Sequence, residues 1–120
     1  MGRLPARVLI VDDSPVFREA VRELLELRGY TVAGEADSAR SAIDAVARLA
    51  PDAVLADVRL PDGDGFALAA ALTRAHPELA VLLASADRVA PSPERVQASG
   101  ARGFVLKSRL AATDLTQFWA

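Results

Sequence analysis

The feature that most constrains the fold is a regular alternation of short apolar runs with longer amphipathic segments. A short continuous apolar run is typical of a strand covered on both faces, and the polar stripe of an amphipathic segment is typical of a surface helix. Strands are predicted at Val8–Val11, Thr31–Glu35, Ala53–Ala56, Leu79–Ala84 and Gly103–Leu106. The alternation favours an α/β fold with a largely parallel sheet.

Helix start and stop signals separate these strands. Helices are predicted from Ser14-Pro15 to Gly29, over Ser38–Leu49 and Phe66–Ala75, and over about Ala111–Trp119. A fourth helix is expected to be short, capped by Ser92, starting near Pro93 and ending before Gly100. In the helix over Ser38–Leu49, apolar spacing predicts that Ile43, Val46 and Leu49 point inward. In the first helix, the residues expected to face water are Arg18, Glu19, Arg22, Glu23 and Glu26.

Length and composition fit one soluble domain spanning residues 1–120. Hydrophobic residues make up 52% and charged residues 25%, which is ordinary for a globular protein. The net charge of −2 predicts no general affinity for nucleic acid or for an anionic membrane, and the absence of cysteine excludes thiolate chemistry. The apolar run Val8–Val11 is too short for a signal peptide or a membrane span, so an intracellular, cytoplasmic protein is expected.

Polar side chains follow four of the five predicted strands. The first strand runs into Asp12 and Asp13, the third into Asp57, the fourth into Ser85 and the fifth into Lys107. Ligands of open α/β sheets bind beyond the carboxyl ends of the strands, so these side chains should meet at one edge.

Such a group of residues suits a cation and a phosphoryl group. Converging carboxylates repel one another unless a cation lies among them, and an all-oxygen site suits Mg²⁺ or Mn²⁺. An ammonium and a hydroxyl would then bind the oxygens of a phosphoryl group. Of the 14 basic residues, Lys107 alone is lysine, which suggests that this position requires an ammonium.

Each residue taken alone also has a simpler interpretation. Asp12, Asp13 or Ser14 could cap the first helix, and Asp57 could form a turn. Lys107 alone would usually be a solvated charge. His76, the only histidine, is expected at the surface with no catalytic role. The coincidence of four strand ends favours a shared site.

Together these residues resemble the receiver domain of bacterial two-component response regulators, over Ala6 to about Trp119. The matching segments are VLIVDDSP, LADVRLPDGDG, LLASAD and GARGFVLKS, and the last is most similar to receivers that precede a helix-turn-helix output domain. The resemblance implies a flavodoxin-like (βα)₅ fold, a doubly wound parallel five-stranded sheet in the order 2-1-3-4-5.

The resemblance also implies roles for individual residues. Asp57 would accept a phosphoryl group from the phosphohistidine of a sensor histidine kinase or phosphotransfer protein, or from a small phosphodonor. Mg²⁺ would be bound by Asp13, Asp57 and the backbone carbonyl of Arg59, with Asp12 acting largely through water. Lys107 would contact the phosphoryl oxygens.

The implied output is a conformational switch. Ser85 would turn toward the phosphoryl group and Phe104 would follow it inward. This would change the face formed by the fourth helix, the fifth strand and the fifth helix (the 4-5-5 face), which would control an output domain, a partner or a homodimer. The domain would catalyse its own phosphorylation and a slow autodephosphorylation.

Three positions depart from the family pattern. Ser108 stands where Pro often forms a cis peptide, and Ser85 stands where Thr is common. Pro91 and Pro93 lie in the region of the fourth helix, which puts a standard dimer through that face in doubt.

Two other functional classes are open at this point. A small-molecule phosphohydrolase with an aspartate nucleophile would need a second catalytic acid and a cap insertion, which this chain lacks. A degenerate receiver that only binds partners is disfavoured by the intact set of site residues. The sequence does not reveal the cognate kinase, the signal, the output or the oligomeric state.

Overall fold

A central parallel sheet carries the fold. A computed structural model describes residues 6–119, and its five-stranded sheet has the order β2-β1-β3-β6-β7. The strands are β1 (Arg7–Val11), β2 (Thr31–Ala36), β3 (Ala53–Asp57), β6 (Ala80–Ser85) and β7 (Gly103–Leu106). When only the five strands of this sheet are numbered in chain order, β6 is the fourth and β7 the fifth, which gives the predicted order 2-1-3-4-5. The flavodoxin-like fold is therefore confirmed. Residues 1–5 and 120 of the predicted 1–120 domain lie outside the described residues.

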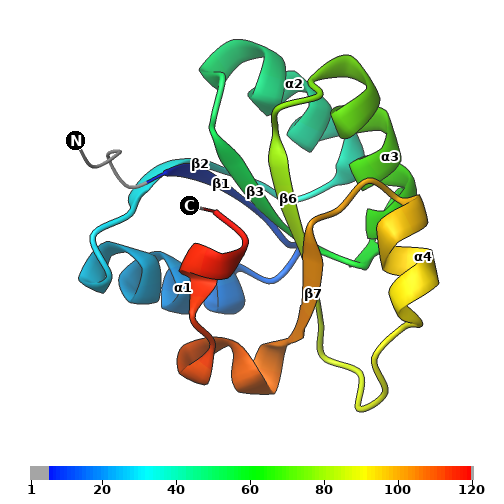
Figure 1. Cartoon of the computed structure of the whole chain (residues 1–120). Coiled ribbons are helices and arrows are strands. Elements are labelled where there is room, and N and C mark those ends of the chain that lie inside the picture. Colours follow the sequence, from blue (N-terminus) through cyan, green and yellow to red (C-terminus); the bar gives the residue numbers. More distant parts are fainter. Residues whose placement is uncertain (1–5, 120) are drawn as a thin grey trace.

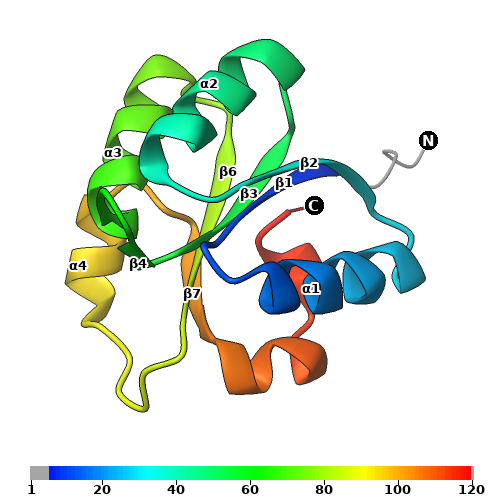
Figure 2. The same ribbon diagram turned by 180° about the vertical axis from the view of Figure 1, so that it is seen from behind.

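Helices cover both faces of the sheet. Figures 1 and 2 show α1 (Pro15–Leu27) with the C-terminal segment on one face, and α2 (Ala39–Leu49) with α3 (Gly65–Ala75) on the other. The short α4 (Pro93–Ala98) lies beside β7. A short antiparallel hairpin joins β3 to α3, and its two strands, β4 (Arg59–Leu60) and β5 (Gly63–Asp64), have two residues each.

Alternate strand residues enter two separate cores, as expected when side chains point to opposite faces of a strand. In β3, Val54 packs with the α2 and α3 side, whereas Leu55 packs with the α1 side. Both are at most 1% exposed. The continuous apolar runs therefore reflect burial of the sheet on both faces.

Local signals account for the ends of α1. The hydroxyl of Ser14 accepts a hydrogen bond from the backbone N–H of Phe17 at 3.2 Å, and Pro15 occupies the first helical position. After the helix, Gly29 has φ 89°, a left-handed conformation that glycine adopts without a side-chain clash. The predicted short α4 is also confirmed, with Ser92 as its cap.

The prediction of a final helix over Ala111–Trp119 is wrong. Two 3₁₀ helices, η1 (Lys107–Ala112) and η2 (Leu115–Gln117), occupy this part of the chain. Thr113 between them has extended backbone, and Asp114 caps η2 by accepting a hydrogen bond from the backbone N–H of Thr116. The expected 4-5-5 face therefore consists of α4, β7 and 3₁₀ turns, without a fifth α-helix among residues 6–119.

The prediction that Ile43 points inward is also wrong. Ile43 is 46% exposed, whereas Ala42, Ala45 and Val46 are buried. The small alanines let α2 approach the sheet closely, so Ala42 and Ala45 take the inner positions in place of Ile43. Val46 is buried and Leu49 packs against the core, as predicted.

Candidate functional site

Four strand ends bring the predicted polar residues to the same edge of the sheet. Val11 pairs with Ala56, Asp57 with Ala84, and Ser85 with Leu106. This register aligns the carboxyl ends of β1, β3, β6 and β7, so the residues at or just after those ends are neighbours.

Asp12 is buried and makes polar contacts through both its side chain and its backbone. Its side chain is 1% exposed. Its Oδ1 accepts a hydrogen bond from the Ser14 N–H at 2.8 Å, and its own N–H donates to the carbonyl of Ala36 at 3.0 Å. Burial raises the pKa of the Asp12 carboxyl above its usual value, even though hydrogen bonds from Lys107 and Ser14 act to lower it.

Asp13 does not cap α1, because the Ser14 hydroxyl fills that position. Its side chain is exposed beside the buried Asp12. Carboxylate oxygens of Asp12, Asp13 and Asp57 all lie within 4.8 Å of one another. Three acids this close repel one another, and the set offers only hard oxygen donors, which fits Mg²⁺ or Mn²⁺.

Lys107 lies between the two buried acids. Its Nζ is 2.5 Å from Oδ2 of Asp12 and 2.9 Å from Oδ2 of Asp57. Burial alone would lower the pKa of Lys107, but the hydrogen bonds to Asp12 and Asp57 outweigh it and raise the pKa above its usual value. The lone lysine is thus a fixed ammonium and not a solvated charge.

Asp57 ends β3 and is 9% exposed. Its Oδ1 accepts a hydrogen bond from the Arg59 N–H at 3.0 Å, which keeps the peptide of Arg59 next to the acid. The Arg59 guanidinium turns away to pair with Asp87 at 3.0 Å. Gly65 packs against this strand end, where an added Cβ would lie only 2.4 Å from the backbone oxygen of Asp57.

Ser85 and Phe104 line one pocket beside the acids, on the side of α4. The pocket has a volume of about 320 Å³ and is also lined by Val58, Arg59 and Phe66, among others. Ser85 is 3% exposed, and its hydroxyl accepts a hydrogen bond from the Asp87 N–H at 3.0 Å. Phe104 is partly buried against the core under α2 and α3. The two residues predicted to move together thus share a cavity.

Two residues at the site were not predicted there. Phe17, an apolar residue of α1, lies under Lys107, and Arg18, expected to face water, donates to the backbone carbonyl of Asp12 at 2.6 Å. The Lys107–Ser108 peptide bond is trans. His76 is exposed at the end of α3, as predicted.

The fold and the acidic edge of the sheet define a class of α/β domain, and comparison with known proteins identifies it. The family model of the response regulator receiver domain matches residues 8–118. The chain belongs to this family and is a receiver domain of two-component response regulators. No helix within residues 6–119 is long and apolar enough to cross a membrane.

Curated relatives are longer than this chain. Response regulator GacA of Pseudomonas viridiflava is 35% identical over 102 residues, covering 84% of this chain and 48% of the relative. The probable transcriptional regulatory protein NarL of Mycobacterium tuberculosis is 39% identical over 102 residues, covering 84% and 47%. The chain therefore spans about half the length of the curated relatives that it matches.

Solved structures have the same fold. A LuxR-family two-component response regulator from an Aurantimonas species superimposes with a TM-score of 0.84 at 32% identity, covering 94% of this chain and 81% of that one. The signal receiver domain of the putative response regulator NarL from Mycobacterium tuberculosis gives a TM-score of 0.78 at 35% identity, with coverage of 97% and 91%.

Proposed function

We propose that Asp57 is the phosphoryl acceptor of this receiver domain and that it works in a Mg²⁺ site. The observation that carries the proposal is the convergence of three carboxylates within 4.8 Å, with an ammonium bound to two of them. The donor is the phosphohistidine of a sensor histidine kinase or phosphotransfer protein. A small phosphodonor such as acetyl phosphate would serve as well.

The proposed metal ligands are Asp13, Asp57 and the backbone carbonyl of Arg59, with Asp12 acting largely through water. A bound Mg²⁺ would supply positive charge that offsets the charge of the acids and of the transferred group. The chemistry of the donors fits, because hard carboxylate and carbonyl oxygens are those that Mg²⁺ prefers.

Transfer itself needs little covalent help from the protein. An oxygen of Asp57 forms a bond to phosphorus as the bond between phosphorus and the histidine nitrogen breaks, and that nitrogen keeps the electron pair. Lys107 holds its ammonium next to Asp57 and meets the phosphoryl oxygens. Water later hydrolyses the aspartyl phosphate slowly, which returns the domain to its starting state.

The conformational response to phosphorylation is proposed to begin at Ser85 and Phe104. The Ser85 hydroxyl would exchange the N–H of Asp87 for a phosphoryl oxygen, and Phe104 would move into the space that it shares with Ser85. The face that changes is formed by α4, β7 and the 3₁₀ turns, and it would control an output domain, a partner or a second copy. We place the domain in the cytoplasm, where kinase and output would meet it, and assign no nucleic-acid or membrane binding to these residues.

Intact mass spectrometry tests the acceptor. Incubation with acetyl phosphate and Mg²⁺ should add one phosphoryl group that is stable in acid and labile in base. Asp57→Ala should abolish the gain. Asp52→Asn is the matched control, because Asp52 flanks the other end of β3, and it should keep the gain. A phosphoryl group on Asp57→Ala would contradict the assignment.

A further inference from the structure

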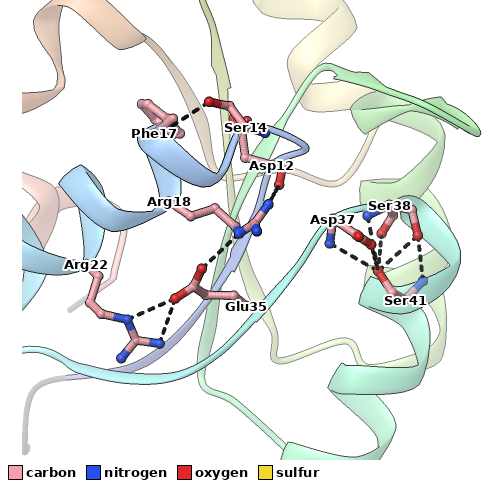
Figure 3. Close-up of polar contacts among 9 residues, drawn as sticks. All are labelled: Asp12, Ser14, Phe17, Arg18, Arg22, Glu35, Asp37, Ser38 and Ser41. Carbon is pink, nitrogen blue, oxygen red and sulfur yellow. Dashed lines mark hydrogen bonds and ion pairs between the residues drawn. The ribbon is translucent and has the colours of Figure 1, made fainter.

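A second group of charges lies behind the acidic site, between α1 and β2 (Figure 3). The Nε of Arg18 donates to Oε1 of Glu35 at 2.8 Å, and the Nε of Arg22 donates to Oε2 of Glu35 at 2.9 Å. Glu35 is thus held by both arginines, one on each oxygen. The group ties one face of α1 to the edge strand of the sheet.

Arg18 alone reaches from this group into the site. Its Nη1 donates to the backbone carbonyl of Asp12 at 2.6 Å while its Nε holds Glu35. The guanidinium is planar and rigid, so fixing one of its N–H groups on Glu35 also fixes the direction of the other. Arg22 uses the same kind of side chain, but its polar contacts within residues 6–119 are with Glu35 and Glu26.

The contact completes the restraint on Asp12. Its N–H is bound by Ala36, its side chain by Ser14 and Lys107, and its carbonyl by Arg18. That carbonyl belongs to the peptide bond that leads to Asp13. Holding it sets the direction in which the chain presents the Asp13 carboxylate.

An ordinary surface ion pair would have different properties. Exposed pairs are mobile and contribute little, whereas the Arg18 side chain is only 18% exposed and joins Glu35 of β2 to Asp12 just after β1. The Arg22 side chain is 37% exposed, and within residues 6–119 it makes no polar contact with Asp12, Asp13 or Asp57.

We propose that Arg18 is a positioning residue of the metal site: clamped by Glu35, it fixes the Asp12–Asp13 peptide in the orientation that binds Mg²⁺. This inference rests on the proposed function, because it assumes that Asp12, Asp13 and Asp57 hold the ion. Residues that orient metal ligands commonly change metal affinity by about tenfold or more when they are replaced.

The sign of the effect separates positioning from simple electrostatics. Arg18→Gln and Arg22→Gln each remove one positive charge near an acidic cluster, and each removes one of the two arginine partners of Glu35. Electrostatics alone predicts that both variants bind a cation more tightly. Positioning predicts that Arg18→Gln binds Mg²⁺ about tenfold more weakly, while Arg22→Gln binds it as well as the wild type or better.

The test measures Mg²⁺ affinity by calorimetry in the unphosphorylated protein, and amide hydrogen exchange at Ser14 without metal. Arg18→Gln should weaken binding and speed exchange of the Ser14 N–H, which bonds the Asp12 side chain. Arg18→Lys keeps the charge but loses the rigid fork, so it should also bind more weakly than wild type, and it replaces the glutamine variant if that one does not fold.

The outcomes are distinct. Wild-type or tighter Mg²⁺ binding by Arg18→Gln and Arg18→Lys would overturn the role of Arg18 and leave the proposed function intact. A wild-type protein that binds no Mg²⁺ would instead overturn the proposed metal site, and the inference with it.

Discussion

The Nζ of Lys107 lies 4.0 Å from the centroid of the Phe17 ring. The same ammonium is hydrogen-bonded to Asp12 and Asp57, so an aromatic face and two carboxylates surround it. A compact ammonium fits this arrangement, and the attraction to the ring adds to that of the acids. Phe17 therefore belongs to the site although it carries no polar group.

A double-mutant cycle should measure this contact. Phe17→Leu keeps an apolar side chain but removes the aromatic face, and Lys107→Met removes the charge. Urea unfolding of both single variants and the double variant should give a coupling energy of about 1 kcal/mol, as for partly buried cation–π pairs. The control pairs Lys107→Met with Phe66→Leu, whose ring faces Arg95 instead, and should give coupling near zero. Equal coupling in both cycles would mean that Phe17 acts only through general packing.

Lys107→Arg should keep the fold and the charge yet uncouple phosphorylation from the response. The guanidinium is a wide planar fork, and it cannot replace an ammonium that lies 2.5 Å and 2.9 Å from two acids while resting on a ring. Phosphorylation is measured by intact mass, and the response by amide exchange over α4 and β7 with and without acetyl phosphate. A wild-type exchange change in the phosphorylated variant would show that charge alone suffices.

Asp13→Asn should stabilise the metal-free protein and remove most of the stabilisation that Mg²⁺ provides. Three acids within 4.8 Å repel one another, at a cost of about 1 kcal/mol per pair when partly exposed, and Mg²⁺ binding only the folded state raises its melting temperature. Because Ser14 caps α1, the change leaves the helix start untouched. Thermal melts with and without Mg²⁺ measure both effects.

Glu19→Gln is the control for that comparison, since it removes an equal charge from an exposed position on α1. It should leave the Mg²⁺ response at the wild-type level. An unchanged Mg²⁺ response in Asp13→Asn would contradict the assignment of Asp13 as a ligand.

Glu35 should contribute stability at neutral pH that is lost in acid. Partial burial alone would raise its pKa, but hydrogen bonds from Arg22 and Arg18 lower the pKa below the usual 4.5. A lowered folded pKa means that the contribution is complete above the unfolded pKa and disappears as the pH falls through the folded pKa. Without metal, Glu35→Gln should therefore be less stable than wild type at about pH 7, and the difference should shrink toward about pH 3. A difference that is the same at both pH values would show that the charge of Glu35 is not involved.

Much of the sheet and its polar edge could be predicted from the sequence. Apolar runs located every strand of the five-stranded sheet to within a residue or so, and the carboxyl ends of parallel strands must share an edge. The short hairpin of β4 and β5 was not predicted. That rule predicted the meeting of Asp12, Asp57 and Lys107 without any knowledge of their distances. The acids follow buried strands directly, so their placement depends on strand positions and not on loop conformation.

The errors arose where tertiary packing decides between local alternatives. Ile43 and Ala42 are neighbours on α2, and only the close approach to the sheet makes the smaller one the core residue. Arg18 lies on a helix face that the sequence pattern predicts to be solvated, and nothing in the sequence indicates that Glu35 of β2 lies next to it. For the last helix a local signal was present: Thr113-Asp114 offers a cap in the middle of the predicted span.

The divided C-terminal segment has a consequence for cooperativity. An α-helix forms and melts largely as a unit, because each added residue depends on the turn before it. Here η1 and η2 are separate short turns. Arg28 donates to the carbonyls of Ala111 in η1 and of Thr113 just after it, whereas Trp119, which follows η2, packs edge-on against Tyr30. The segment can therefore open in stages, with η2 detaching from the α1 face while η1, which begins at Lys107, stays in place. Such partial opening would uncover apolar surface at one end of the α1 face while the acidic edge keeps its geometry.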